Sequence, residues 1–504
     1  MVKLSFNKLT LAFIGLSAVF CTFCLAKAQA PRVNSGRPPA SRPVASRPAV
    51  VKPVEKPPII VASIGDYTIT DQELEKRLLT EIRPMSYGNY NEVPEPVKTD
   101  KVLLKMIAEK AVISEARKGD YLKDESLASI IKRYRDGQLV QLLLQKQLQP
   151  MLTVTEPEIE KRMKADPKLT RARAEATIKQ LKARMLFSQY YKHVTQKFHA
   201  KKLTENFPKA VQIHQRLLTQ PKKPRTGAFI RITQTKEELT QEEKDMVLAT
   251  FDKGKVTLKD WLDTLCEMAP PGRPKDLNTV NGVEKLLDNA LTKPLLLAEA
   301  VMLGVDKDKD FLNKVRDYED NRLLSKVRSD KYREVKQPTT EEIKAYFDKN
   351  REVFRKDKTL KIDVIWCDDL KTARSVKAEL DAGKDFEELK QKHSLVKTTK
   401  PYSIYPGSEG LFWKDLWKGD PNDVIGPMKG FQRSGIKWRI VKILEKNPGT
   451  LTDYSSDMDS RIKDKMMTER REAIFEQYGN EVLKKYTYQI YADKIKNIDP
   501  LNIP

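Results

Sequence analysis

Short apolar runs separated by turn residues open the part of the chain that is expected to fold, from Ile59 onward. Ile60–Ile64 predicts a strand, and Gly65 with Asp66 supplies a turn. Thr70 and the glutamate three residues later have the spacing of a capping box, which marks the start of a helix. Leucines then recur at helical spacing and give this helix an apolar face.

Helical spacing of apolar residues dominates the next part of the chain. Apolar side chains recur every three or four positions over Thr99–Lys118, and Gly119 is expected to end this helix. Another helix is expected over residues 127–148, and Thr155 with Glu158 opens a fourth. The pattern therefore predicts a mainly α protein.

The same order of signals returns later in the chain. Val247–Phe251 predicts a strand, Gly254 a turn, and Thr257 the cap of a following helix. A Thr-Thr-Glu-Glu run at residues 339–342 then matches the cap at residues 155–158. The offset stays near roughly 185 residues, which indicates an internal duplication. Chance similarity between two helical stretches is the alternative, and the shared order of strand, turn, cap and helix argues against it.

A long returning helix is expected to close each copy. Residues 182–207 and 463–490 share their length, their aromatic content and a Lys-Lys pair, Lys201-Lys202 in the first and Lys484-Lys485 in the second. The second copy is interrupted by a segment that the first lacks. The expected domains are residues 59–245, residues 246–355 together with 449–500, and the interrupting residues 356–448.

The interrupting segment has the pattern of a small α+β unit and an ordered set of motifs. Strands are expected over residues 360–366 and 436–444, and helices over Leu370–Asp381 and residues 385–393. The motifs are Ala378-Glu379-Leu380, Ala382-Gly383-Lys384-Asp385-Phe386, Leu389, Ser394, Gly407, Gly410-Leu411-Phe412, Gly426-Pro427-Met428 and residues 440–445.

This order of motifs resembles the parvulin-type (PpiC) peptidyl-prolyl isomerase domain of folding factors such as SurA and PrsA. The flanking helices, with the strand-turn-cap run at residues 62–70, resemble the SurA-type chaperone module, in which the isomerase domain is an insert. The resemblance implies a mainly α fold with a small α+β insert. It would be a duplicated SurA-type helical chaperone module whose second copy carries a parvulin-like domain.

The resemblance also locates the catalytic positions. Prolyl rotation has a barrier of roughly 18–20 kcal/mol, and parvulins lower it with an apolar pocket beside two histidines. The first histidine position falls on Val364 and the second on Arg439, or on Lys437 in another register. No catalytic residue is therefore intact, because valine is apolar and a guanidinium stays charged. Weak or absent isomerase activity is expected, although pocket desolvation alone could leave residual catalysis.

Peptide-binding residues are expected around the family's apolar pocket. Four of the five tryptophans fall in residues 356–448. Core packing is the competing interpretation for most of them, and Trp413 and Trp417, on an expected loop, are the preferred groove residues. The candidates are Leu411, Phe412, Trp413, Trp417, Met428 and Trp438.

The N-terminus points to export. Residues 1–30 combine lysines, an apolar stretch and a small-residue Ala-Gln-Ala site, which is typical of a signal peptide; an uncleaved membrane anchor is the alternative. Residues 31–58 are rich in proline and arginine and predict a disordered linker. The expected location is the periplasm or the cell envelope.

Charge and cysteine content limit the partners and cofactors. Lys and Arg outnumber Asp and Glu by 93 to 70, a formal charge of +23, which suits acidic polypeptides or an anionic envelope surface. Nucleic acid is not expected for an exported chain. After processing only Cys266 and Cys367 remain, and two separate thiols are preferred to a disulfide. The four histidines lack metal-ligand spacing and are expected on surfaces or helices, so no metal and no cofactor is predicted.

Three functions are compatible with the sequence. The first is an exported folding factor that binds unfolded or extended polypeptides, outer-membrane proteins among them. The second is an active peptidyl-prolyl isomerase. The third is an envelope docking protein that binds an anionic surface through its basic arm.

Overall fold

The computed structural model describes residues 57–83, 91–222, 229–432 and 435–502. Helices predominate and are accompanied by small antiparallel sheets, as the sequence predicts. The expected signal peptide and the proline-rich linker up to residue 56 lie outside the described residues. Among those that are described, no helix combines the length and the apolarity that crossing a bilayer requires.

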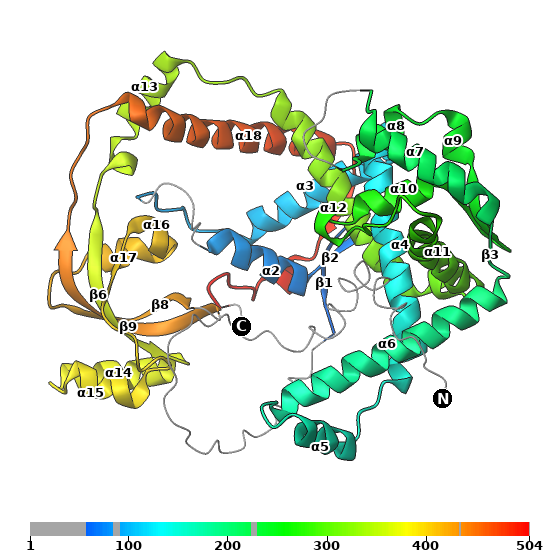
Figure 1. Ribbon diagram of the computed structural model, residues 1–504. Coiled ribbons are helices and arrows are strands. Elements are labelled where there is room, and N and C mark those ends of the chain that lie inside the picture. Colours follow the sequence, from blue (N-terminus) through cyan, green and yellow to red (C-terminus); the bar gives the residue numbers. More distant parts are fainter. Residues whose placement is uncertain (1–56, 84–90, 223–228, 433–434, 503–504) are drawn as a thin grey trace. The chain divides into compact units, whose positions relative to one another are not determined.

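The described chain forms two compact units, which we call the middle unit (residues 128–319) and the terminal unit (residues 57–127 and 320–502). In Figure 1 the terminal unit contains the blue and the orange-to-red parts of the ribbon. The division falls within two long helices, α4 (Glu125–Leu148) and α12 (Lys309–Arg333). Each of the two expected modules therefore contributes residues to both units.

The terminal unit contains a three-stranded antiparallel sheet of order β10-β1-β2. Thr70 caps the helix that follows, and its hydroxyl accepts a hydrogen bond from the Glu73 N–H, so the predicted capping box is confirmed. The predicted helix over Thr99–Lys118 is also confirmed, with Gly119 as its C-cap. The elements are β1 (Ile60–Ile64), β2 (Tyr67–Thr70), α2 (Asp71–Ile82), α3 (Thr99–Lys118), η1 (Asp120–Lys123), α13 (Thr340–Lys349), η6 (Arg351–Phe354), η8 (Ser456–Met458), α18 (Asp459–Leu483), β10 (Tyr488–Ile490) and α19 (Ala492–Ile495).

The middle unit contains a second three-stranded antiparallel sheet, of order β3-β4-β5. The predicted strand over Val247–Phe251 and the cap at Thr257 are confirmed. The elements are η2 (Gln149–Met151), α5 (Glu156–Ala165), α6 (Arg171–Lys197), β3 (Lys201–Lys202), η3 (Thr204–Asn206), α7 (Phe207–Thr219), α8 (Ile232–Glu237), α9 (Gln241–Asp245), β4 (Val247–Phe251), β5 (Gly254–Thr257), α10 (Leu258–Glu267), η4 (Pro270–Gly272), α11 (Val280–Met302) and η5 (Val305–Lys307).

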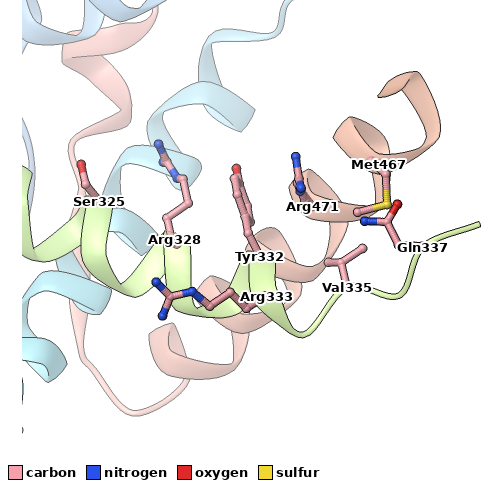
Figure 2. A pocket seen from close by; sticks show the side chains of 9 residues that line it. Ser325, Arg328, Tyr332, Arg333, Val335, Gln337, Met467 and Arg471 are labelled. Carbon is pink, nitrogen blue, oxygen red and sulfur yellow. The ribbon is translucent and has the colours of Figure 1, made fainter. Parts of the chain in front are cut away.

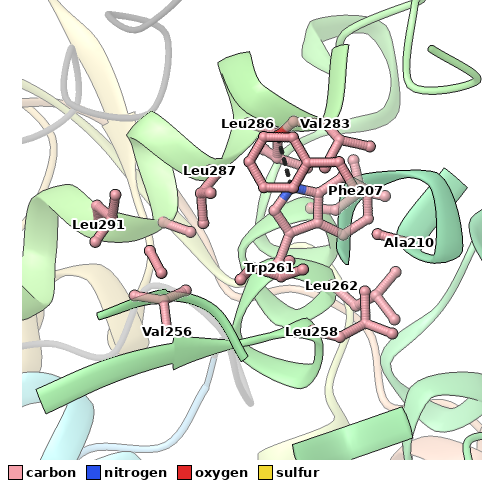
Figure 3. Packing of buried hydrophobic residues seen from close by; sticks show 14 of the residues in the cluster. Phe207, Ala210, Val256, Leu258, Trp261, Leu262, Val283, Leu286, Leu287 and Leu291 are labelled. Atoms are coloured by element: carbon pink, nitrogen blue, oxygen red, sulfur yellow. Dashed lines mark hydrogen bonds between the residues drawn. The ribbon is translucent and has the colours of Figure 1, made fainter. Parts of the chain in front are cut away.

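Trp261 lies at the centre of the middle unit's core. Figure 3 shows its indole surrounded by side chains of α7, α10 and α11 and hydrogen bonded to the Val283 carbonyl oxygen, at 3.0 Å. His214 of α7 packs edge-on against the same indole and is 6% exposed. His214 thus lies on a helix, one of the two locations expected for it, on the α7 face that turns into the core.

Both expected returning helices end earlier than predicted. The first ends at Lys197, where Phe198 turns into the core and His199 adopts a φ of 46°, and Lys201-Lys202 forms β3 instead. The second ends at Leu483, and residues 488–490 form β10. In each case the chain after the helix adds a strand to a hairpin edge, whose free N–H and C=O groups need partners.

The insert, residues 356–448, is built around a four-stranded antiparallel sheet of order β7-β6-β9-β8. Helices α14 and α15 pack on one face, and α17 packs on the other (Figure 1). The predicted strands and helices are confirmed, whereas β7, β8 and the short helices were not predicted. The elements are β6 (Thr359–Cys367), α14 (Leu370–Asp381), α15 (Phe386–His393), β7 (Tyr402–Ile404), α16 (Pro406–Glu409), η7 (Gly410–Phe412), α17 (Trp413–Trp417), β8 (Val424–Gln432) and β9 (Gly435–Asn447).

Candidate functional site

The two expected catalytic positions of the insert lie on adjacent strands. Val364 of β6 stands opposite Val441 of β9, and Trp366 stands opposite Arg439. Because side chains alternate along a strand, Val364 and Arg439 share the face that α17 covers. Val364 is 0% exposed and belongs to the apolar cluster on that face. The structure thus brings the two predicted positions together, one of them as core.

Arg439 forms a buried ion pair. Its side chain is 1% exposed, and its Nη2 donates to a Glu409 carboxylate oxygen at 2.6 Å. The guanidinium lies 5.3 Å from the ring centroid of Trp366 and 5.9 Å from that of Phe412. Gly430 makes room for it, because any side chain there would collide with the guanidinium. Such a cation packs and orients its neighbours but does not exchange a proton at neutral pH.

Lys437, the position given by the other register, also carries an ion pair. Its ammonium group lies 2.7 Å from an Asp368 carboxylate oxygen, at the end of β6. A second buried pair, Lys390 with Asp363 at 2.5 Å, joins α15 to the opposite face of the sheet. Cations on both faces of this sheet are therefore engaged by carboxylates.

The six peptide-binding candidates divide by exposure. Trp413 is 2% exposed and Phe412 is also buried, and both contribute to the packing of this face. Trp413 and Trp417 stack at 5.2 Å in α17 rather than in a loop. Half-buried Trp417 lies between the ammonium groups of Lys358 and Lys446. The other half-buried candidates are Leu411, Met428 and Trp438.

A cavity of about 500 Å³ lies outside the insert, in the terminal unit. We call it the arginine pocket. The last turns of α12, the extended residues after it and one face of α18 form its walls (Figure 2). Its principal lining residues are Arg328, Tyr332, Arg333, Val335, Met467 and Arg471.

Cations and aromatic rings alternate in the arginine pocket. Figure 2 shows Arg328 and Arg471 on either side of Tyr332. The Arg328 guanidinium lies 4.6 Å from the ring centroid of Phe475, and that of Arg471 lies 5.9 Å from the ring of Tyr332. Burial raises the pKa of Tyr332, so its hydroxyl remains a neutral hydrogen-bond donor. The arrangement can bind an anion beside an aromatic surface.

A second cavity, of about 550 Å³, lies in the middle unit. We call it the glutamine cavity. Its walls come from α4 and the first turn of α12, with Phe311 and Leu142 as apolar lining. Four glutamine amides face it, and amides both donate and accept hydrogen bonds. These residues are Gln138, Gln141, Gln145 and Gln149.

The chain is similar in structure to SurA-like chaperones and PrsA foldases. One match is to the Campylobacter jejuni SurA-like chaperones PEB4 and Cj1289, with 14% identity over 47% of this chain and 97% of the other, at a TM-score of 0.23. The PrsA foldase of Streptococcus pneumoniae matches with 16% identity over 37% of this chain and 68% of its own, at 0.23. The Bacillus cereus PrsA matches with 15% identity over 51% and 96%, at 0.21. No protein-family model and no curated protein matches the chain.

Metal and thiol chemistry find no support in the described ranges. No group of three or more His, Cys, Asp or Glu side chains there could hold a metal ion. Cys266 and Cys367 are unpaired, in agreement with the preferred interpretation. Burial raises the pKa of each thiol to about 11, which keeps both protonated and poorly nucleophilic.

Sequence reasoning missed the arginine pocket. Its walls come from two helices that are far apart in the chain, and neither carries a recognised motif. The one local signal is the i, i+4 spacing of Arg328 and Tyr332, which places both side chains on one face of α12. That signal is common in solvated helices, so it did not single out this segment.

Proposed function

We propose that this protein is an exported folding factor that binds unfolded or extended polypeptides, and that its parvulin-like insert has little or no isomerase activity. The observation that carries the proposal is the state of the two expected catalytic positions. The motif order of the insert resembles an isomerase domain, yet one position is the buried Val364 and the other is Arg439, paired with Glu409. Exported clients, outer-membrane proteins among them, and a location in the periplasm or envelope belong to the same proposal.

We also propose that the chain arose by duplication of a helical chaperone module. Two pairs of helix caps support this, because both repeat at the same offset. Asp124 accepts a hydrogen bond from the Leu127 N–H at 2.9 Å, and Asp308 accepts one from the Phe311 N–H at 3.1 Å. The capping box of Thr155 and Glu158 likewise returns as Thr339 and Glu342.

Ion pairs of the returning helices repeat as well. Lys182 of α6 lies 2.6 Å from Glu158 of α5, and Arg470 of α18 lies 2.7 Å from Glu342 of α13. By this relation Lys197 of the first copy is equivalent to Lys485 of the second. This equivalence replaces the one expected from the sequence, in which Lys201-Lys202 matches Lys484-Lys485. Tyr134 and Tyr318, equivalent in the two copies, stack on each other at 3.7 Å, an isologous contact of the kind that two-fold repeats make.

The copies would have exchanged their second halves. The hairpin of the first copy pairs with β10 of the second, and the hairpin of the second copy pairs with β3 of the first. Ion pairs follow the same exchange: Lys485 with Glu115 in the terminal unit and Lys197 with Glu299 in the middle unit, both at 2.8 Å. An exchange of identical elements between repeats accounts for both units at once.

The test combines two assays on the full mature chain and on a variant that lacks residues 356–448. Light scattering of a chemically unfolded client reports aggregation, and a proline-containing peptide reports cis–trans exchange. We expect both proteins to suppress aggregation and neither to accelerate exchange. Failure of the folded full chain to suppress aggregation would overturn the folding-factor proposal. Acceleration that disappears with the deletion would instead establish an active isomerase.

A further inference from the structure

The arginine pocket has cationic walls that the protein neutralises only in part. Three arginines line the cavity, and its lining includes no carboxylate. Arg328 has one carboxylate partner, Glu109, at 3.1 Å, which also binds Arg77. Arg333 pairs with Asp330 at 2.9 Å. Within the described part of the chain, Arg471 has no ion pair with a carboxylate. Positive charge therefore remains available at the mouth of a concave site.

Buried donors in the same place lack acceptors. The Nε–H groups of Arg328 and Arg471 are both buried, and neither has a hydrogen-bond partner among the described residues. Buried polar groups in native proteins are nearly always hydrogen bonded, so two unpartnered donors beside one cavity need an explanation. An anionic acceptor that enters the pocket would supply charge-assisted hydrogen bonds to these guanidinium groups.

In the middle unit, apolar side chains close the equivalent seam, by which we mean the contact between α4 and α6, as α12 and α18 form the seam of the terminal unit. The repeat correspondence places Leu144, Leu148 and Ala183 at the positions of Arg328, Tyr332 and Arg471. All three are buried, and the two leucines pack with Phe187, the counterpart of Phe475. The same helix–helix seam thus contains an aliphatic core in one unit and cations around an open cavity in the other.

We infer that the arginine pocket binds an acidic side chain of an extended polypeptide. A carboxylate fits the forked donors of arginine, and the ring of Tyr332 with the side chains of Met467 and Val335 offers apolar surface to a neighbouring residue. This mixture favours a polypeptide over a phosphate group, for which the apolar lining has no use. The inference deepens the proposed function, because it names the chemistry of the client segment that this protein selects.

The test uses the full mature chain and two short, unstructured, fluorescein-labelled peptides with blocked termini. One contains tyrosine beside glutamate, and its twin has glutamine in place of glutamate. We expect the wild type to bind the acidic peptide more tightly, and Arg471→Gln to weaken that binding by roughly tenfold, the loss of one charge-assisted contact. Binding of the glutamine twin should not change. Arg471→Lys keeps the charge and should lie between wild type and Arg471→Gln.

The matched control is Lys463→Gln, which removes one positive charge from α18 outside the pocket lining. It should bind the acidic peptide as the wild type does. Equal weakening by Lys463→Gln and Arg471→Gln would overturn the pocket in favour of diffuse attraction. Unchanged binding of the acidic peptide by folded Arg471→Gln would also overturn it. So would an Arg471→Gln variant that loses binding to phosphatidylglycerol vesicles but still binds the acidic peptide as the wild type does. If the wild type still suppresses client aggregation, any of these results contradicts the pocket but not the proposed function.

Discussion

The two units use the same local construction and differ in what fills the seam between their helices. Each has a hairpin, a capped helix and a third strand that arrives from a distant part of the chain. The backbone contacts repeat in detail: the Tyr491 N–H donates to the Val61 carbonyl, and the Leu203 N–H donates to the Leu248 carbonyl, both at 2.9 Å. These backbone contacts are thus shared, whereas the side chains between the helices differ.

The difference shows which positions are constrained by folding. In the middle unit, Leu144, Leu148 and Ala183 close the seam, and the burial of these apolar side chains stabilises the unit. In the terminal unit, Arg328, Tyr332 and Arg471 keep a cavity of about 500 Å³ at the corresponding seam. Cations in a half-buried seam stabilise less than leucines would, so their presence points to a role in binding.

The insert is a second difference between the two units. In the middle unit five residues separate α5 from α6, whereas in the terminal unit α13 and α18 are separated by the whole insert. Both helix pairs nevertheless retain a small apolar cluster, Ile159 with Ile178 in one and Ile343 with Met466 in the other. A long insertion is tolerated there because its ends leave and re-enter adjacent helix termini.

The largest expected effect comes from placing the terminal unit's cation in the middle unit's seam. Leu144→Arg would bury an unpaired guanidinium among leucines and should destabilise the middle unit by about 4 kcal/mol. Urea unfolding followed by circular dichroism measures this loss. Leu144→Met, which keeps the volume and the apolar character, serves as the control and should cost about 1 kcal/mol or less. A cost of Leu144→Arg no larger than that of Leu144→Met would mean that this seam is not closed.

Acid should weaken the middle unit through His214. Burial, followed by the nearby Arg273, lowers the pKa of this imidazole from 6.5 to about 4. The unfolded chain therefore binds a proton that the folded unit excludes as pH falls from 6.5 toward 4, and stability is lost over that window. The expected loss is about 3 kcal/mol by pH 4, measured by urea unfolding across this range.

The control for acid sensitivity is His214→Phe, which keeps an aromatic ring against Trp261 but cannot be protonated. Its unfolding free energy should fall less steeply than that of the wild type between pH 6.5 and 4. Parallel pH profiles for the two proteins would show that His214 is not the group responsible.

Local signals in the sequence were sufficient for the helices and their caps. Thr99–Lys118 and Leu370–Asp381 were predicted to the residue, because their apolar spacing and terminal residues act within one helix. The capping box at Thr70 and the helix starts at Thr155 and Thr257 were also predicted, since each depends on residues a few positions apart.

Features that depend on partners far away in the chain could not be predicted from the sequence. Strands β3 and β10 are two and three residues long and exist because a hairpin edge receives them. Their identity as strands is a tertiary effect, and the helices predicted over these residues are therefore wrong. The arginine pocket has the same origin, because α12 and α18 form it jointly. The pairing of Arg439 with Glu409 likewise joins two elements that no sequence pattern connects.

A smaller effect tests whether the two hairpin helices are equivalent. Thr70→Ala and Thr257→Ala each remove a hydroxyl that accepts an N–H hydrogen bond at 3.3 Å, from Glu73 and Asp260 respectively. Each should cost about 1 kcal/mol in unfolding free energy. Serine at either position keeps the acceptor and should restore most of that loss. Markedly unequal costs in the alanine variants would argue against a shared local construction.

The smallest expected change comes from the reverse exchange, Arg328→Leu, which gives the terminal unit its counterpart's residue. Leucine would pack on Phe475 and remove a buried Nε–H that lacks a partner, while Glu109 keeps Arg77 at 3.2 Å. The loss of one ion pair opposes this gain, so stability should rise by about 0.5 kcal/mol or stay unchanged. Urea unfolding measures the difference, with Arg333→Leu as the control at a mostly exposed position. A clear loss of stability in Arg328→Leu alone would mean that the cation is structural. Unchanged stability would mean that folding does not require this arginine, which leaves the pocket's charge to be explained by what the pocket binds.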